Sequence, residues 1–235
     1  MKTGMFSVAA LALVAGLAEA DTINVKFTGT GAGSNVHITS PSYNGDVFAG
    51  QLKHTLSDGT GAAAAYNGNW LTYCTDLAQH VTSNTKTYDV VSITLLPDSS
   101  PMGAAKANAL RSIYNTANST QSSSATSNDL ATAFQLAVWE IVTDFNPAAA
   151  NDGLSITAGS FRATKTTGAA LSSGVMTQLN NLLTSAALGA GGTDIVGIRS
   201  GSYQDQILPI TVPAPGSAAL ASLGLLCLGG RRRGR

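Results

Sequence analysis

Tyr73-Cys74 and Phe134-Gln135-Leu136-Ala137-Val138-Trp139 are the two short stretches on which the interpretation of this chain depends. Once the two ends of the 235-residue sequence are set aside, Cys74 is its single cysteine, because Cys227 lies in the C-terminal tail. A chain with one thiol cannot close an internal disulfide, so this thiol needs another explanation. The alternatives are a small buried hydrophobe, an intermolecular link, a nucleophile and half of a side-chain crosslink.

The first twenty residues have the organisation of a secretory signal peptide. Lys2 gives a positive start, residues 5–17 are almost entirely apolar, and Ala18-Glu19-Ala20 is a small-x-small cleavage site. The apolar stretch is shorter than the ~20 residues that a spanning helix needs. We therefore expect signal peptidase to cleave after Ala20.

Residues 212–235 have the layout of a sorting signal. Val212, Pro213, Ala214 and Pro215 are followed by a short apolar run, residues 216–230, and by an arginine-rich end. This layout resembles the PEP-CTERM signal of Gram-negative bacteria, which an exosortase processes at the membrane, although Ala214 stands where that family most often has Glu. The resemblance implies export across the inner membrane and transient association of the tail with it. A permanent tail anchor is the alternative.

Charge excludes several classes of partner. The sequence has 13 basic and 13 acidic residues, and its two ends hold five of the basic and one of the acidic residues. Residues 21–211 therefore carry 8 basic and 12 acidic residues, a net charge near −4. This sign argues against nucleic acid, which needs clustered Lys and Arg, and against anionic lipid surfaces. About 190 residues are enough for one domain with a real core.

Strand patterns stand at both ends of this domain. Alternating or continuous apolar positions between Gly, Asn and Asp turn signals predict strands at residues 22–27, around 36–38, and at 47–56, 70–77, 88–96, 194–198 and 206–211.

Between these strands the apolar period changes to that of a helix. One helix is expected from Pro101, capped by Ser100, to Ala117, and a second from Ser127 or Asn128 to about Asp144. A weaker pattern covers residues 175–188. Strands around a helical block predict an α+β fold, a β-sandwich or barrel with an inserted helical subdomain.

Cys74 and Gln135 carry the chemistry that we consider most informative. Cys74 falls in a predicted strand beside Tyr73, and Gln135 falls in a predicted helix with Trp139 one turn later on the same face. If they meet where the helix packs on the sheet, the thiolate can attack the carboxamide carbon, and ammonia leaves. The product is an internal thioester, which needs no cofactor and serves a single covalent attachment rather than turnover.

The same residues resemble the Cys-Gln thioester domains of bacterial surface proteins. In that family a strand cysteine follows an aromatic residue, and the glutamine lies in a helix motif Thr-Gln-x-Ala-Ile-Trp. Gln135, Ala137 and Trp139 match the helix motif, whereas Phe134 replaces Thr and Val138 replaces Ile. The resemblance covers roughly residues 45–211. It implies a Cys74–Gln135 crosslink shielded by Tyr73 and Trp139, and a surface or matrix partner that bears an amine or hydroxyl.

Two other functions are compatible with the same residues. One is a structural extracellular-matrix protein of the same fold in which Cys74 stays a free, buried thiol. The other, an enzyme that uses Cys74 as its nucleophile, ranks last because no family signature surrounds the cysteine. The three histidines, His37, His54 and His80, have no zinc-ligand spacing, so no metal is expected. We expect a non-enzymatic protein on the cell surface or in the extracellular matrix.

Overall fold

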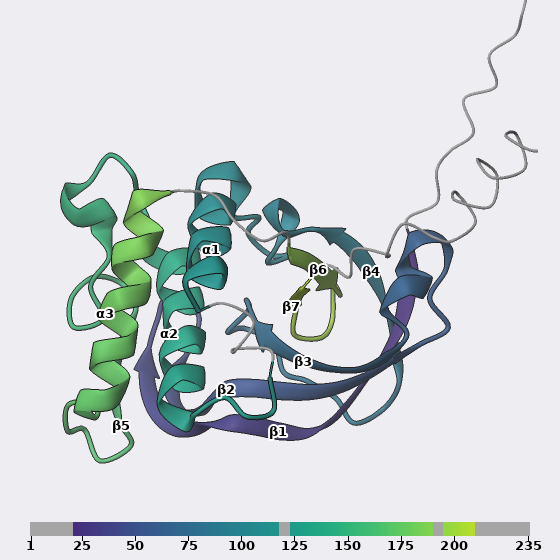
Figure 1. Ribbon diagram of the computed structural model, residues 1–235, viewed down its shortest axis with the longest axis horizontal. Coiled ribbons are helices and arrows are strands. Elements are labelled where there is room, and N and C mark those ends of the chain that lie inside the picture. Colours follow the sequence, from purple (N-terminus) through teal and green to yellow (C-terminus); the bar gives the residue numbers. More distant parts are fainter. Residues whose placement is uncertain (1–20, 118–122, 190–194, 210–235) are drawn as a thin grey trace, which may run out of the picture.

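The computed structural model describes residues 21–117, 123–189 and 195–209 (Figure 1). The strands in this part of the chain are β1 (Thr22–Thr39), β2 (Asn44–Ser57), β3 (Gly68–Cys74), β4 (Lys86–Ser92), β5 (Arg162–Lys165), β6 (Ile195–Arg199) and β7 (Gln206–Pro209). The α-helices are α1 (Gly103–Ala117), α2 (Asn128–Asp144) and α3 (Ser173–Leu188). Within these ranges no helix is long and apolar enough to cross a membrane.

Six of these strands close into a ring. The order is β1, β2, β3, β7, β6, β4 and back to β1, and every neighbouring pair is antiparallel. The short β5 pairs with the far end of β1, outside the ring. The helices are inserted between β4 and β6, so the predicted α+β fold with an inserted helical part is confirmed. The strand pairings are those of a small barrel.

The ring has its own apolar interior, separate from the core under the helices. Alternate residues of a closed sheet point inward, and on β1 these are Ile23 and Val25, while Lys26 is exposed. The cluster that they join comes from the ring strands and one 3-10 helix, and contains Ile23, Val25, Leu56, Ala63, Tyr66, Tyr88, Val196, Ile198 and Leu208. A larger second cluster fills the space between the helices and the sheet.

The N-terminal strand differs from the sequence prediction. Two strands were expected on either side of the glycine-rich residues 29–33, but β1 runs unbroken through them, with register shifts between Phe27 and Gly29 and between Thr30 and Gly33. Gly33 pairs with Gly50 of β2, and a Cβ on Gly50 would lie 2.3 Å from the Ala32 carbonyl oxygen. The glycines therefore allow a bulged, closely paired strand rather than a turn.

Several predicted boundaries were also wrong. β3 ends at Cys74 rather than near residue 77, because the Asp76 carboxylate accepts the Ala78 N–H and turns the chain. β4 gives way to a 3-10 turn after Ser92, and α1 begins at Gly103 rather than at residue 101. β5 was missed altogether. Its four residues include charged Arg162 and Lys165 and offer no apolar alternation.

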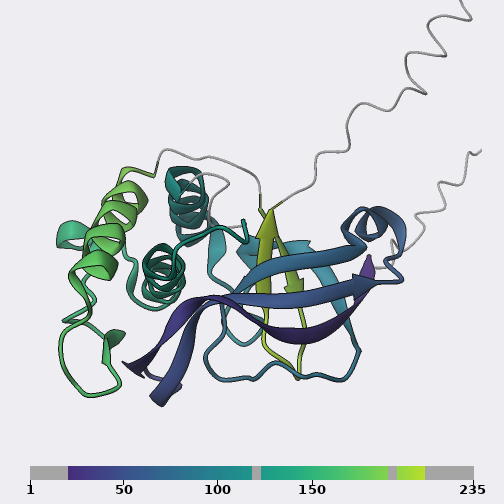
Figure 2. The same ribbon diagram turned by 60° about the horizontal axis from the view of Figure 1, so that its bottom comes forward.

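Helix α2 is the centre of the helical layer. It contacts α1 and α3 on one side and β1, β2 and β3 on the other, so residues 131–141 are all buried. The Ser127 hydroxyl accepts the Leu130 N–H and caps the helix, which begins and ends as predicted. In Figures 1 and 2 the long β1–β2 hairpin runs from beneath α2 to the opposite end of the molecule. Every side chain of the central α2 turns therefore faces protein rather than water.

Candidate functional site

Cys74 is the last residue of β3, at a point where one of the two neighbouring strands has ended. On one side β3 still pairs with β7, where Cys74 lies opposite Gln206. On the other side the last pair with β2 is Thr72 with Leu52. The next residue still bonds to the β7 side, where the Thr75 N–H donates to the Asp205 carbonyl oxygen. Because hydrogen-bonding direction alternates along a strand, the N–H and C=O of Cys74 face the side that β2 has left.

Gln135 of α2 occupies that vacated strand position. Its Oε1 accepts the Cys74 backbone N–H at 3.0 Å, and its Nε2 donates to the Cys74 carbonyl oxygen at 2.8 Å. One carboxamide thus replaces the missing strand partner and satisfies both backbone groups. Gln135 is completely buried, so no water competes for these hydrogen bonds. The amide is held in one orientation.

This orientation places the carboxamide against the thiol. The Cys74 sulfur lies 3.4 Å from Gln135 Oε1, and the carboxamide carbon is bonded to that oxygen. A thiol fixed at this range needs no diffusional encounter to attack the carbonyl carbon. The Cys74 N–H already points at the oxygen on which negative charge would develop, as a donor of an oxyanion hole does. The predicted pair is therefore brought together, in a geometry suited to acyl chemistry.

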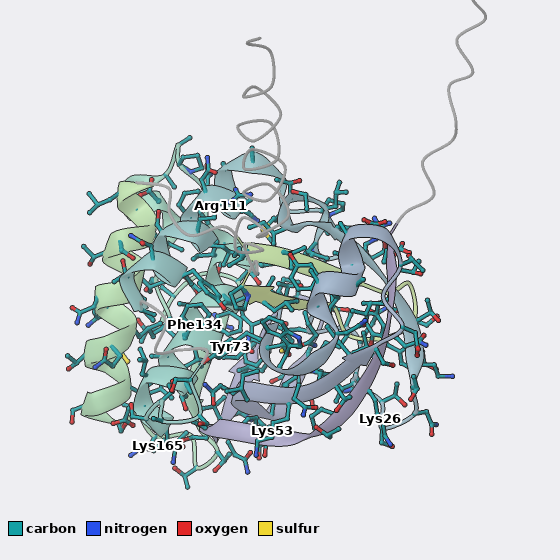
Figure 3. All side chains as sticks on the ribbon, turned by 45° about the vertical axis from the view of Figure 1, so that its right-hand side comes forward. Lys26, Lys53, Tyr73, Arg111, Phe134 and Lys165 are labelled. Atoms are coloured by element: carbon teal, nitrogen blue, oxygen red, sulfur yellow. The ribbon has the colours of Figure 1, made fainter. Side chains whose placement is uncertain are left out.

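Aromatic residues stand next to both members of the pair in the sequence, and Figure 3 shows two of them, Tyr73 and Phe134, close together. The Tyr73 ring lies 4.6 Å from that of Phe134, which also meets Tyr114 edge-on at 5.4 Å. Trp139 packs at 6.2 Å from Phe161. Tyr73 and Trp139 are at most 2% exposed. Phe134, the departure from the family motif, is a fully buried member of this aromatic group.

Burial dominates the electrostatics of the thiol. It raises the pKa of Cys74 well above the ordinary range, while the Trp139 side chain and the Cys74 backbone act to lower this pKa and Asp76 raises it further. The resting thiol is therefore neutral at pH 7. A nucleophile of this kind depends on proximity, and it lacks the lowered pKa of a typical catalytic cysteine.

A pocket of about 290 Å³ connects this site to the surface. Its walls are mainly apolar, and Cys74 and Trp139 line it together with Gln79, His80 and Gln204. The Gln79 Oε1 atom is buried without a hydrogen-bond partner. An unpaired acceptor of this kind suits an incoming N–H or O–H group. Neither Gln79 nor His80 was predicted for the site, since only the turn after Cys74 brings them back to it.

Apart from His80, which lines the pocket, the histidines lie in two different environments. His37 Nδ1 lies 2.8 Å from Asp46 Oδ1 on the exposed side of β1. His54 is buried, and its Nδ1 lies 2.9 Å from the Thr72 hydroxyl, so burial lowers its pKa to about 4. Among the described residues, no three His, Cys, Asp or Glu side chains gather closely enough to hold a metal ion.

Two buried carboxyls near the site have raised pKa values. Burial raises the pKa of Glu140 to about 7, against the opposing hydrogen bond from the Ser155 N–H. Its Oε2 atom is buried without a partner. Burial likewise raises the pKa of Asp205 to about 6, although the carboxylate accepts N–H bonds from Asp98 and Ser200. Neither carboxyl was singled out in the sequence, where an isolated acid gives no sign of burial.

The predicted signal cleavage at Ala20 and the sorting motif Val212, Pro213, Ala214 and Pro215 lie outside the described residues.

The site lies in a region that is similar to a known family. A family model described as "TED: Thioester domain" matches residues 71–187, a range that includes β3 from Leu71, the whole of α1 and α2, and most of α3. Cys74 and Gln135 both lie within it. No match was found among curated proteins or among solved structures.

Proposed function

We propose, from the match of residues 71–187 to the thioester domain family, that this protein attaches itself covalently to a nucleophile-bearing partner through a Cys74–Gln135 thioester. The observation that carries the proposal is the double hydrogen bond of the Gln135 carboxamide to the Cys74 backbone, with the sulfur 3.4 Å from Oε1. The match supports a thioester-containing protein. The crosslink between these two residues and the attachment are our inference.

The bond forms and reacts in two balanced steps. The Cys74 sulfur bonds to the Gln135 carboxamide carbon, the C–N bond breaks, and the nitrogen leaves as ammonia with the thiol proton. Later an amine or hydroxyl of the partner attacks the same carbon, and the C–S bond breaks. The products are an amide or ester to the partner and a free Cys74 thiol. Each molecule reacts once, so the protein acts as a covalent binder and not as a turnover enzyme.

Shielding explains how such an acyl group survives in water. We infer that Tyr73 and Trp139, which are both buried, shield the pair, and Trp139 lines the small pocket together with Cys74. Exclusion of water slows hydrolysis of a reactive intermediate. The Gln79 acceptor in the pocket favours a nucleophile that bears an N–H or O–H group. We propose that this chemistry serves an adhesive or matrix-associated role at the cell surface.

Export and sorting complete the proposal. Signal peptidase would remove residues 1–20 after Ala20, and an exosortase would process the tail that begins with Val212, Pro213, Ala214 and Pro215. The tail would associate with the inner membrane only in transit. These steps would place the domain on the surface, or in the extracellular matrix, of a Gram-negative bacterium.

A small amine tests the attachment chemistry. The exported protein, incubated with methylamine, is expected to gain one methylamide on Gln135 and one free thiol on Cys74, both found by peptide mass mapping. A Cys74→Ala variant, which keeps Gln135, serves as the control and should gain nothing. Equal labelling of Gln135 in both proteins, or in neither, would exclude the thioester. A free thiol in the untreated protein would favour a structural matrix protein with an inert, buried Cys74.

A further inference from the structure

We propose that the indole N–H of Trp139 is a catalytic donor that stabilises the Cys74 sulfur as it leaves the acyl carbon. This inference rests on the thioester of the proposed function and adds an active role to the shielding one.

The first observation is a hydrogen-bond donor left without an acceptor. Trp139 is 2% exposed, and its Nε1 is buried without a hydrogen-bond partner. An indole nitrogen can only donate, and a buried donor without an acceptor is costly and uncommon. Trp70, the other tryptophan, shows the ordinary arrangement, since its Nε1 donates to the Tyr66 carbonyl oxygen at 2.6 Å. The Trp139 N–H therefore has no well-aligned acceptor in the resting protein.

The second observation is where this donor lies. Trp139 follows Gln135 by one helical turn on the same face of α2, and it lines the 290 Å³ pocket together with Cys74. Its N–H is near enough to the sulfur to lower the thiol pKa, in opposition to burial, but makes no aligned hydrogen bond with it. The Trp139 N–H lies beside the sulfur, and we expect its hydrogen bond to Cys74 Sγ to become strong only when the sulfur gains negative charge.

Charge appears on the sulfur in one step of the reaction. When an amine nitrogen bonds to the acyl carbon, the C–S bond breaks and its electron pair stays on Cys74 Sγ. The proton that the nitrogen loses finally reaches this sulfur. Before it arrives, a thiolate stands in a site where burial opposes ionisation. A hydrogen bond that strengthens at this moment lowers the barrier, because it is stronger in the transition state than in the ground state.

The donor role and a purely shielding role predict opposite results for Trp139→Phe. The phenyl ring keeps much of the cover but has no N–H. Loss of shielding would leave the reaction with a nucleophile unchanged or faster. Loss of the donor should slow it by about tenfold or more, the usual worth of a hydrogen bond to a charged group.

The test uses the full exported protein as wild type, Trp139→Phe and the control Trp70→Phe. Intact mass first gives the fraction that carries the thioester, and the rate of thiol release by methylamine is then measured on that fraction. We expect Trp70→Phe to react at the wild-type rate and Trp139→Phe about tenfold or more slowly. A Trp139→Phe rate equal to or above that of the wild type overturns the donor role while leaving the thioester intact.

A second measurement does not require the thioester. On a Gln135→Ala background Cys74 is a free thiol, and its alkylation rate by iodoacetamide as a function of pH reports its ionisation. Adding Trp139→Phe should move this profile to higher pH, whereas adding Trp70→Phe should not. If Gln135→Ala has the same pH profile with and without Trp139→Phe, the donor role is contradicted. This holds even if the single Trp139→Phe variant forms no thioester. If the wild type carries no thioester but the pH profile still shifts, the proposed function is refuted and the hydrogen bond from Trp139 to the sulfur is not.

Discussion

At the scale of single residues, Phe134 is the informative departure from the family motif. Its ring lies against Tyr73 and Tyr114 and is fully buried. A threonine there would have a smaller side chain and a hydroxyl to satisfy in an apolar site. In the sequence this position differs from the motif only in that Phe134 replaces Thr. The packing indicates that Phe134 supports the position of the Tyr73 ring.

Replacing Phe134 measures this contribution. Phe134→Thr, which restores the family residue, should lower the free energy of unfolding by about 3 kcal/mol, since truncation of a buried ring leaves a cavity. Phe134→Leu, the control, fills more of the space and should cost about half as much. Urea unfolding of the exported protein checks both values. A Phe134→Thr variant as stable as the wild type would mean that the Phe134 ring is not a structural support.

Glu140 should make stability depend on pH. An exposed Glu carboxyl has a pKa of 4.5, but burial raises the pKa of Glu140 to about 7 in the folded protein. The folded protein therefore keeps this proton to a higher pH than the unfolded chain does. Between these pH values the folded state binds more protons, so the free energy of unfolding falls as pH rises. We expect a decrease of about 2 kcal/mol between about pH 4.5 and 7.5 from this carboxyl.

Glu140→Gln isolates this effect in urea unfolding at several pH values. The amide keeps an acceptor for the Ser155 N–H but cannot ionise. Asp205, with a pKa raised to about 6, also makes stability fall as pH rises through that range, and it does so in both proteins. The difference between wild type and variant therefore belongs to Glu140. Parallel pH profiles would show that Glu140 ionises normally in the folded protein.

At the scale of elements, the key contact is the one between α2 and the end of β3. The sequence predicted both elements, because apolar spacing and the Ser127 cap mark α2 and the aromatic residues mark β3. It also predicted that Cys74 and Gln135 could meet. It could not predict that β2 stops pairing two residues before Cys74, which is what leaves the backbone free for the carboxamide. Strand ends and register depend on non-local pairing, which local patterns do not contain.

A double variant measures this contact without the crosslink. Cys74→Ala cannot form a thioester but keeps the two hydrogen bonds from Gln135 to the backbone of residue 74. Adding Gln135→Ala leaves that N–H and C=O unpaired in a buried site. We expect the double variant to fold but to be less stable than Cys74→Ala by about 2–4 kcal/mol in urea unfolding. Equal stability would mean that these hydrogen bonds contribute nothing to the fold.

At the scale of the whole molecule, the α+β class with its helical insertion followed from the sequence, which left open whether the strands form a sandwich or a barrel. Closure requires β1 to pair with both β2 and β4, and β7 to lie between β3 and β6. The pairs β1–β4 and β3–β7 join strands that are far apart in the chain, so tertiary packing sets their order. The glycine-rich segment of β1 was misjudged for a related reason. Glycines that usually mark turns here permit close pairing with Gly50.

Export gives a prediction for the ends of the chain. Because Ala18 and Ala20 fit the small-residue requirement of signal peptidase, the exported protein should begin at Asp21. N-terminal sequencing of the protein recovered outside the inner membrane checks this start. Recovery with Met1 still in place would contradict the signal peptide. An Ala20→Leu variant, blocked at the cleavage site, should remain at the membrane with its N-terminus intact.

The most direct test of the central claim is the intact mass of the exported protein under denaturing, non-nucleophilic conditions, together with titration of its thiol. Wild type is expected to weigh one ammonia less than its processed sequence requires and to show no free thiol at Cys74. Cys74→Ala and Gln135→Ala should each have the full mass of their own sequences, because the bond needs both the sulfur and the carboxamide carbon. A wild-type protein of full mass with a freely titrating Cys74 would contradict the covalent mechanism.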